Sequence, residues 1–221
     1  MMQPIVNSRS LPKFFLQSVY LFLVVMWLWV GVVSYMVVGG FQAPFSGVSN
    51  SMGVLLLILV GGAAYCVREV EGLNFFMVSL FAGGLGVLGG ELGIAYREVY
   101  LLFYFCLLAT LVALWLWAVC SAYRFNYLVG FASTLLLSLI VGAVLHSTFL
   151  YTTTELMGIG GLVLTAQVYL LASSANLTLS IELPPTIEGA ICMVLGDLQG
   201  AYYVGEVVSQ VLQMLSWFIW W

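Results

Sequence analysis

Charged side chains are scarce in this sequence. Its 221 residues include five Lys or Arg and nine Asp or Glu, so 6% are charged and 63% are hydrophobic. Soluble domains carry about a quarter charged residues. So few charges cannot cover a water-facing surface, and residues 1–12, which precede the first apolar run, are too few to bury a core. The composition excludes a soluble globular protein and predicts one that is solvated by lipid.

Metal-binding and catalytic side chains are equally few. The single histidine, His146, cannot supply the two imidazoles of a bis-histidine haem or the larger set of a haem–copper centre. The four cysteines lie in or beside apolar runs without a CxxC pair, so we interpret them as small buried hydrophobic residues. The P-loop, GxSxG and HExxH motifs do not occur. The sequence therefore disfavours a self-contained enzyme.

Long apolar runs take the place of the missing charge. The strands of a membrane barrel alternate apolar and polar residues, whereas residues 20–31 and 101–120 are apolar almost throughout. We therefore expect an all-α, polytopic transmembrane helix bundle. Because a span needs about 20 apolar residues, the breaks rich in Gly, Pro, Asn and charge predict about seven spans in one domain, at residues 14–38, 52–67, 73–96, 100–121, 127–150, 156–181 and 189–221.

The basic residues predict the orientation of these spans. With seven spans, Arg9, Lys13, Arg68 and Arg124 share one side of the membrane, and Arg97 lies on the other. Basic residues concentrate on the inner side of membrane proteins. We therefore expect the N-terminus inside, in the matrix or cytoplasm, and the C-terminus outside.

One acidic residue lies well inside an expected span. Burying the Glu91 carboxylate costs several kcal/mol unless it is protonated, solvated or hydrogen-bonded. Around it, Gly86, Gly90 and Gly93 belong to GxxxG-like spacings that let a neighbouring helix approach closely. Two interpretations stay open: a tight helix contact around a protonated glutamate, or a proton-accessible or lipid-headgroup site.

Two other titratable residues lie within expected spans. Glu206 is in the seventh, and we consider it either structural or a second proton-related candidate. His146 is near the end of the fifth span. It is either a neutral side chain bonded to a nearby carbonyl or hydroxyl, or a group that relays protons or binds a ligand.

Five short motifs follow one another along the chain: Arg68-Glu69, Gly-Leu-Asn-Phe-Phe-Met-Val at 72–78, Tyr96, the glycine-rich stretch 158–166, and Gly-Ala-Tyr-Tyr at 200–203 before the final Trp-Trp. In order and spacing they resemble motifs of cytochrome c oxidase subunit III, a seven-helix subunit of the haem–copper oxidases. The resemblance covers most of the chain, and the expected orientation agrees with it.

The resemblance implies a specific role. Subunit III has no redox centre, packs beside the catalytic subunit, holds phospholipids in a V-shaped cleft between its first two helices and the other five, and supports proton uptake and turnover. It implies haem a and copper only in partner subunits, bound phospholipids here, and no nucleic acid. Arg68 would meet a lipid phosphate at the membrane interface. A single lysine and many Phe, Leu, Trp and Tyr residues suit a mitochondrial gene, and the resemblance implies a multi-pass protein of the mitochondrial inner membrane.

The sequence departs from this family at its acidic and histidine positions. The family carboxylate of the third helix aligns with Gly84, whereas Glu91 is seven residues later. Seven residues are nearly two helical turns, so Glu91 would lie on the same face about 10 Å further along the axis. The family histidines of the sixth and seventh helices are missing.

Two alternatives stay open. One is a hydrophobic subunit of NADH dehydrogenase, such as its sixth, although that subunit usually has five spans. The other is a small transporter, which we would expect to show internal repeats and helices broken by Gly or Pro. We see no repeat, and the spans lack interior prolines.

Overall fold

The computed structural model describes residues 13–39, 57–63, 66, 70, 73–120 and 127–179. The expected seventh span at 189–221 lies outside these residues, as do Arg68 and Glu206. The expected second span at 52–67 is described only in part, where residues 57–63 form a short helix.

The described residues are helical, with no strand among them. The long helices are α1 (Lys13–Val38), α3 (Leu73–Ala95), α4 (Arg97–Cys120), α5 (Tyr127–Phe149) and α6 (Thr153–Leu179). All five are long and apolar enough to cross a membrane. The all-α membrane architecture is thereby confirmed, and five expected spans coincide with these helices to within a few residues. The total of seven and the orientation stay predictions.

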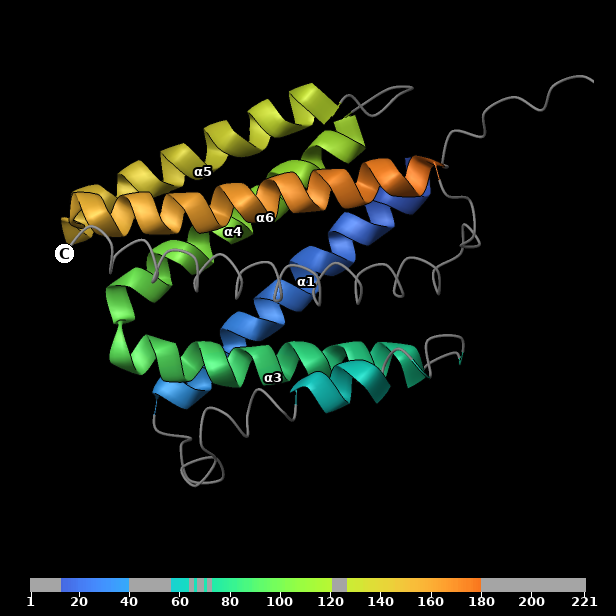
Figure 1. Ribbon diagram of the computed structural model, residues 1–221, viewed down its shortest axis with the longest axis horizontal. Coiled ribbons are helices and arrows are strands. Elements are labelled where there is room, and N and C mark those ends of the chain that lie inside the picture. Colours follow the sequence, from blue (N-terminus) through green and yellow to red (C-terminus); the bar gives the residue numbers. More distant parts are fainter. Residues whose placement is uncertain are drawn as a thin grey trace, which may run out of the picture.

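The helices form a layered body (Figure 1). In that view α3 runs along one edge and α5 along the other, with α1 and α4 crossing diagonally between them. α1 contacts α3 and α4, while α6 contacts α4 and α5. α4 therefore joins the two halves of the body.

The direction of α1 relative to α3 constrains the topology. Trp29 bonds Ser79, and further along α1 Val37 lies against Gly90. The second contact lies closer to the C-terminal end of both helices than the first, so α1 and α3 are parallel. The end of α1 and the beginning of α3 thus lie at opposite ends of the body, as an intervening crossing at 52–67 would require.

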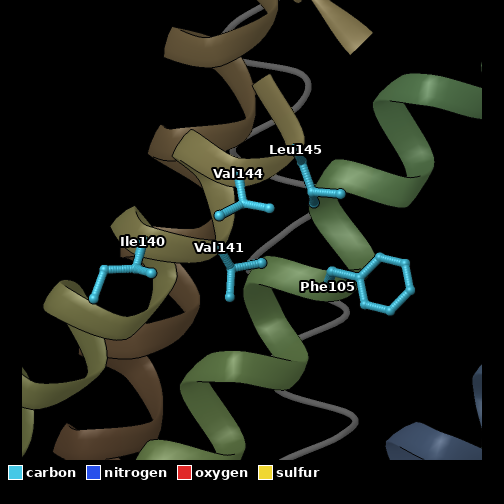
Figure 2. Close-up of a pocket in the computed structure, with 5 residues that line it drawn as sticks. All are labelled: Phe105, Ile140, Val141, Val144 and Leu145. Carbon is cyan, nitrogen blue, oxygen red and sulfur yellow. The ribbon is translucent and has the colours of Figure 1, made fainter. Parts of the chain in front are cut away.

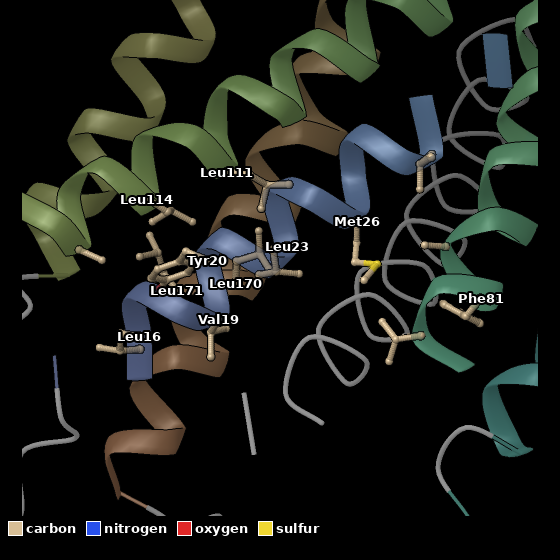
Figure 3. Packing of buried hydrophobic residues seen from close by; sticks show 14 of the residues in the cluster. Leu16, Val19, Tyr20, Leu23, Met26, Phe81, Leu111, Leu114, Leu170 and Leu171 are labelled. Carbon is tan, nitrogen blue, oxygen red and sulfur yellow. The ribbon is translucent and has the colours of Figure 1, made fainter. Parts of the chain in front are cut away.

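The main hydrophobic core lies where α1 meets the other helices (Figure 3). Val19, Tyr20 and Leu23 of α1 are almost fully buried. Figure 3 shows Tyr20 and Leu23 on the side of α1 toward Leu111 and Leu114 of α4, with Leu170 and Leu171 of α6 close by. Each fully buried side chain of this kind contributes about 1.5–3 kcal/mol where water is the alternative environment. Within a bilayer, the close packing itself supplies more of the stabilisation.

α1 packs directly on both α3 and α4. The V-shaped cleft that the resemblance implies, between the first two helices and the other five, involves spans outside the described residues and stays a prediction. The short helix at 57–63 also touches α3, with the Leu57 side chain against Gly84.

Large apolar side chains are exposed on the outside of the body. Leu128, Leu136 and Leu139 of α5 are each more than half exposed, and α1 exposes Tyr35 and Met36 to a similar degree. Apolar exposure on this scale would drive aggregation in water. It is the surface expected of helices whose outer faces meet lipid.

Candidate functional site

Glu91 lies on α3 with its side chain half-buried. It makes no hydrogen bond or ion pair with any described residue. Its own helix turns the glycines at 86, 89, 90 and 93 inward and leaves the carboxylate on a neighbouring face. Both interpretations of Glu91 given above stay open. The described contacts leave the carboxylate free to meet solvent, a lipid headgroup or another chain.

The three glycines predicted to pack closely, Gly86, Gly90 and Gly93, lie against α1 or α4. A Cβ atom on Gly86 would come within 2.8 Å of the Val30 carbonyl oxygen and 2.7 Å of the Val33 Cβ. On Gly90 it would come within 2.5 Å of the Val37 Cβ. On Gly93 it would meet the Tyr100 ring at 3.2 Å. At the first two positions no larger residue fits unless the backbones separate.

The hydroxyl groups of Ser34 and Tyr100 connect the α1–α3 contact to α4. The Ser34 Oγ lies 2.8 Å from the Gly86 carbonyl oxygen, 2.8 Å from that of Val30 and 2.7 Å from the Tyr100 hydroxyl oxygen. The serine has one proton, so it donates to a carbonyl while the tyrosine hydroxyl can donate to it. Ser34 is buried at 2% exposure. The three helices α1, α3 and α4 are thereby joined at one polar point.

A reciprocal pair of hydrogen bonds joins α1 to α4. The Trp27 Nε1 donates to the Tyr104 carbonyl at 3.1 Å, and the Tyr104 hydroxyl donates to the Trp27 carbonyl at 3.2 Å. Their rings stack with centroids 5.6 Å apart. The Tyr104 ring fills the space beside Gly31, where a Cβ would collide with it. Both polar groups of the pair are used in helix packing.

The most buried polar cluster joins α4, α5 and α6. The Gln167 Nε2 donates to the Thr110 hydroxyl at 2.9 Å and to the Ser138 hydroxyl at 2.8 Å. Each hydroxyl donates to a backbone carbonyl one turn earlier, that of Cys106 or Thr134. Gln167 is 1% exposed and Thr110 is fully buried. Sequence reasoning missed this cluster, although each residue is an uncharged polar group near the middle of an apolar helix.

A second cluster lies where α4 begins and α5 gives way to α6. The Tyr151 hydroxyl donates to the Glu98 carbonyl at 2.9 Å, and the tyrosine ring stacks on His146. Burial and the nearby Glu98 carboxylate raise the pKa of Tyr151, so it stays a neutral donor. The His146 Nδ1 is buried and has no hydrogen-bond partner among the described residues. The hydroxyl of the neighbouring Ser147 donates to the Val144 carbonyl.

A shallow groove between α4 and α5 is lined only by apolar side chains (Figure 2). Phe105 comes from α4, and the residues facing it come from α5: Ile140, Val141, Val144 and Leu145. It holds no polar or titratable group that could take part in a reaction. Its lining suits contact with hydrocarbon.

The polar side chains described above serve mainly to join helices. Among the described residues, no group of three or more His, Cys, Asp or Glu side chains could hold a metal ion. The buried hydroxyls and amides bond to one another or to backbone carbonyls.

Comparisons with known proteins add no family to this description. No family model, no curated protein and no solved structure matches the chain.

Proposed function

We propose that this chain is a non-redox core subunit of a respiratory cytochrome c oxidase, embedded in the mitochondrial inner membrane beside the catalytic subunit. In this role it binds phospholipid, supports proton uptake and turnover, and leaves haem a and copper to its partners. The proposal rests on the order of motifs that resemble oxidase subunit III, at 68–69, 72–78, 96, 158–166 and 200–203.

One structural observation fits this role. The polar side chains of α1, α3 and α4 are used to join those helices, whereas large apolar side chains are exposed on their outer faces and on α5. A subunit that works by packing needs a rigid interior and apolar outer faces for lipid and neighbouring subunits. The half-exposed Glu91 carboxylate is the proton-related candidate within the described helices.

The proposal is tested by gentle purification of the chain from its native membrane, followed by an optical spectrum of the complex that migrates with it. We expect the absorption of haem a in a constant ratio to this chain. Flavin without haem a would favour the alternative of an NADH dehydrogenase subunit. A monodisperse chain without any chromophore-bearing partner would contradict both and leave a small transporter.

The role of Glu91 is tested within that complex. Glu91→Gln keeps the size of the side chain but removes the titratable group. If Glu91 takes part in proton uptake, oxidase turnover should fall while the haem a content stays unchanged. Gln17→Leu is a matched control, because it removes a partly buried amide that only joins α1 to α4. Equal turnover in the Glu91→Gln and wild-type complexes would remove Glu91 from the proposal.

A further inference from the structure

The apolar groove between α4 and α5 lies close to one end of these helices (Figure 2). Its α5 lining, within residues 140–145, lies about 6 to 14 Å along the helix axis from the last residue of α5, Phe149. Each leaflet of a membrane holds about 15 Å of hydrocarbon. The groove therefore lies at the depth of a phospholipid acyl chain, and any selectivity among lipids depends on the polar groups above it.

An unpaired carboxylate lies above the groove on α4. Glu98 precedes Phe105 by seven residues, or nearly two turns, so both are on the same face of α4, about 10 Å apart along its axis. The Glu98 side chain is exposed and forms no hydrogen bond or ion pair with any described residue. The adjacent Arg97 lies about 100° around the helix, so the two side chains do not face each other. The end of the groove nearer the membrane surface thus carries negative charge.

Two hydroxyl groups lie above the groove on α5. Ser147 follows Ile140 by seven residues, and Thr148 follows Val144 by four. These spacings place both hydroxyls on the face of α5 that lines the groove. Each donates its one proton to the Val144 carbonyl oxygen, at 2.7 Å from Ser147 and 3.1 Å from Thr148. Both hydroxyl oxygens are therefore left as hydrogen-bond acceptors.

We propose that the α4–α5 groove binds phosphatidylethanolamine, with one acyl chain between Phe105 and Val144 and the ammonium group at Glu98. An ammonium group has a positive charge and three N–H donors, as the lysine side chain has. It can donate to the Glu98 carboxylate and to the hydroxyl oxygens of Ser147 and Thr148. Such charge-assisted hydrogen bonds are roughly twice as strong as neutral ones. The site is additional to the phospholipid cleft that the resemblance implies.

Other common headgroups fit these acceptors less well. Choline carries a positive charge but has no N–H donor, so it cannot hydrogen-bond to the two hydroxyl oxygens. Phosphatidylglycerol has a net negative charge, which the Glu98 carboxylate repels. The polar groups above the groove therefore distinguish ethanolamine from headgroups that carry the same acyl chains.

The experiment uses the full-length chain in phosphatidylcholine nanodiscs that contain a small amount of a probe lipid with a diazirine in its acyl chain. The probe has an ethanolamine, a choline or a glycerol headgroup. After photolysis, mass spectrometry compares crosslinks at residues 140–145 with those at Leu21, Val25 and Leu28, which are exposed on α1, a helix without acidic residues. We expect the groove-to-α1 ratio to be severalfold higher for the ethanolamine probe than for the other two.

Two variants test the role of the carboxylate. Glu98→Gln keeps the backbone carbonyl to which the Tyr151 hydroxyl donates, and it should lower the ratio for the ethanolamine probe to that for the choline probe. Glu155→Gln is a matched control. It removes an acid at the same end of the bundle, while glutamine can keep the helix cap with Thr152. This control should leave the ratio unchanged.

Either of two results would overturn the proposal. One is a wild-type ratio for the ethanolamine probe no higher than that for the choline or glycerol probe, which needs no variant and so holds even if Glu98→Gln fails to fold. The other is a folded Glu98→Gln chain that keeps the wild-type preference for ethanolamine. Neither result depends on the proposed respiratory role, because the measurement follows the isolated chain.

Discussion

At the scale of single residues, glycines determine how closely the helices approach. Gly86 lies against the α1 backbone, where an added methyl group would come within 2.8 Å of the Val30 carbonyl oxygen. A methyl group added to Gly158 of α6 would have no neighbouring atom within 4 Å. Both glycines lie within helices, one in α3 and one in α6. Substituting each therefore separates the effect of steric crowding from the effect of helix propensity.

We predict that Gly86→Ala destabilises the protein and Gly158→Ala does not. Overpacking a well-filled contact costs about 1–3 kcal/mol, whereas replacing an open helical glycine by alanine gains up to about 1 kcal/mol. Thermal unfolding in detergent, followed by circular dichroism, measures both. Equal midpoints for the two variants would show that α1 and α3 are not in close contact at Gly86.

A second residue-scale prediction concerns Leu150, which ends α5 in the left-handed conformation with φ of 54°. That conformation costs a side chain with a Cβ about 1–2 kcal/mol, so Leu150→Gly should leave stability unchanged or raise it slightly. Leu128 is the matched control, because it is also 77% exposed but lies within α5. Leu128→Gly should cost about 1 kcal/mol. Similar losses in both unfolding midpoints would contradict the assigned backbone conformation.

At the scale of elements, α6 begins with a reciprocal cap. The Glu155 backbone N–H donates to the Thr152 hydroxyl oxygen at 3.3 Å, and the Glu155 carboxylate accepts from the Thr152 backbone at 2.8 Å. These bonds satisfy donors that the first turn of a helix leaves free. They also explain why α6 begins at Thr153, directly after the short turn at residues 150–152.

We predict that Thr152→Ala loosens the first turn of α6. Loss of an N-cap hydroxyl costs about 1 kcal/mol, and hydrogen exchange at residues 153–156 should quicken accordingly. Thr154→Ala, which removes an exposed hydroxyl two residues after the cap that takes no part in it, should leave the exchange rates as they are. Unchanged protection in Thr152→Ala would show that the turn is held by tertiary contacts alone.

The sequence predicted the elements better than their contacts. Uninterrupted apolar runs are sufficient to locate membrane helices, which is why α1, α3, α4, α5 and α6 lie close to their expected positions. The pairing of Gln167 with Thr110 and Ser138 depends on which faces of three separate helices meet. A uniformly apolar helix gives little indication of its inward face, so that information was not available from the pattern.

At the scale of the whole molecule, the ends of the helices fall on two sides. Tyr151 contacts Glu98, so the α5–α6 turn and the α3–α4 junction lie at the same end of the body. The distribution of basic residues predicts that this end faces away from the side that holds the N-terminus. Topology can therefore be tested at positions that the structure has already placed together.

We predict that Tyr96→Cys and Leu150→Cys are labelled by a membrane-impermeant maleimide from the same, outer side. Both wild-type residues are exposed, at 65% and 77%. Cys66 and Cys120 are also exposed and are best replaced by serine beforehand. Labelling of the two positions from opposite sides would contradict the arrangement of helices, and labelling of both from the inner side would reverse the predicted orientation.

The most direct test of the proposed role is to separate this chain from the complex that carries it and to measure haem a and copper in both fractions. We predict that haem a absorption and copper remain with the other subunits, that the separated chain contains neither, and that the depleted complex loses sustained turnover before it loses its haem spectrum. Haem or copper retained by the separated chain would contradict a non-redox role. Normal sustained turnover in the depleted complex would contradict a supporting one.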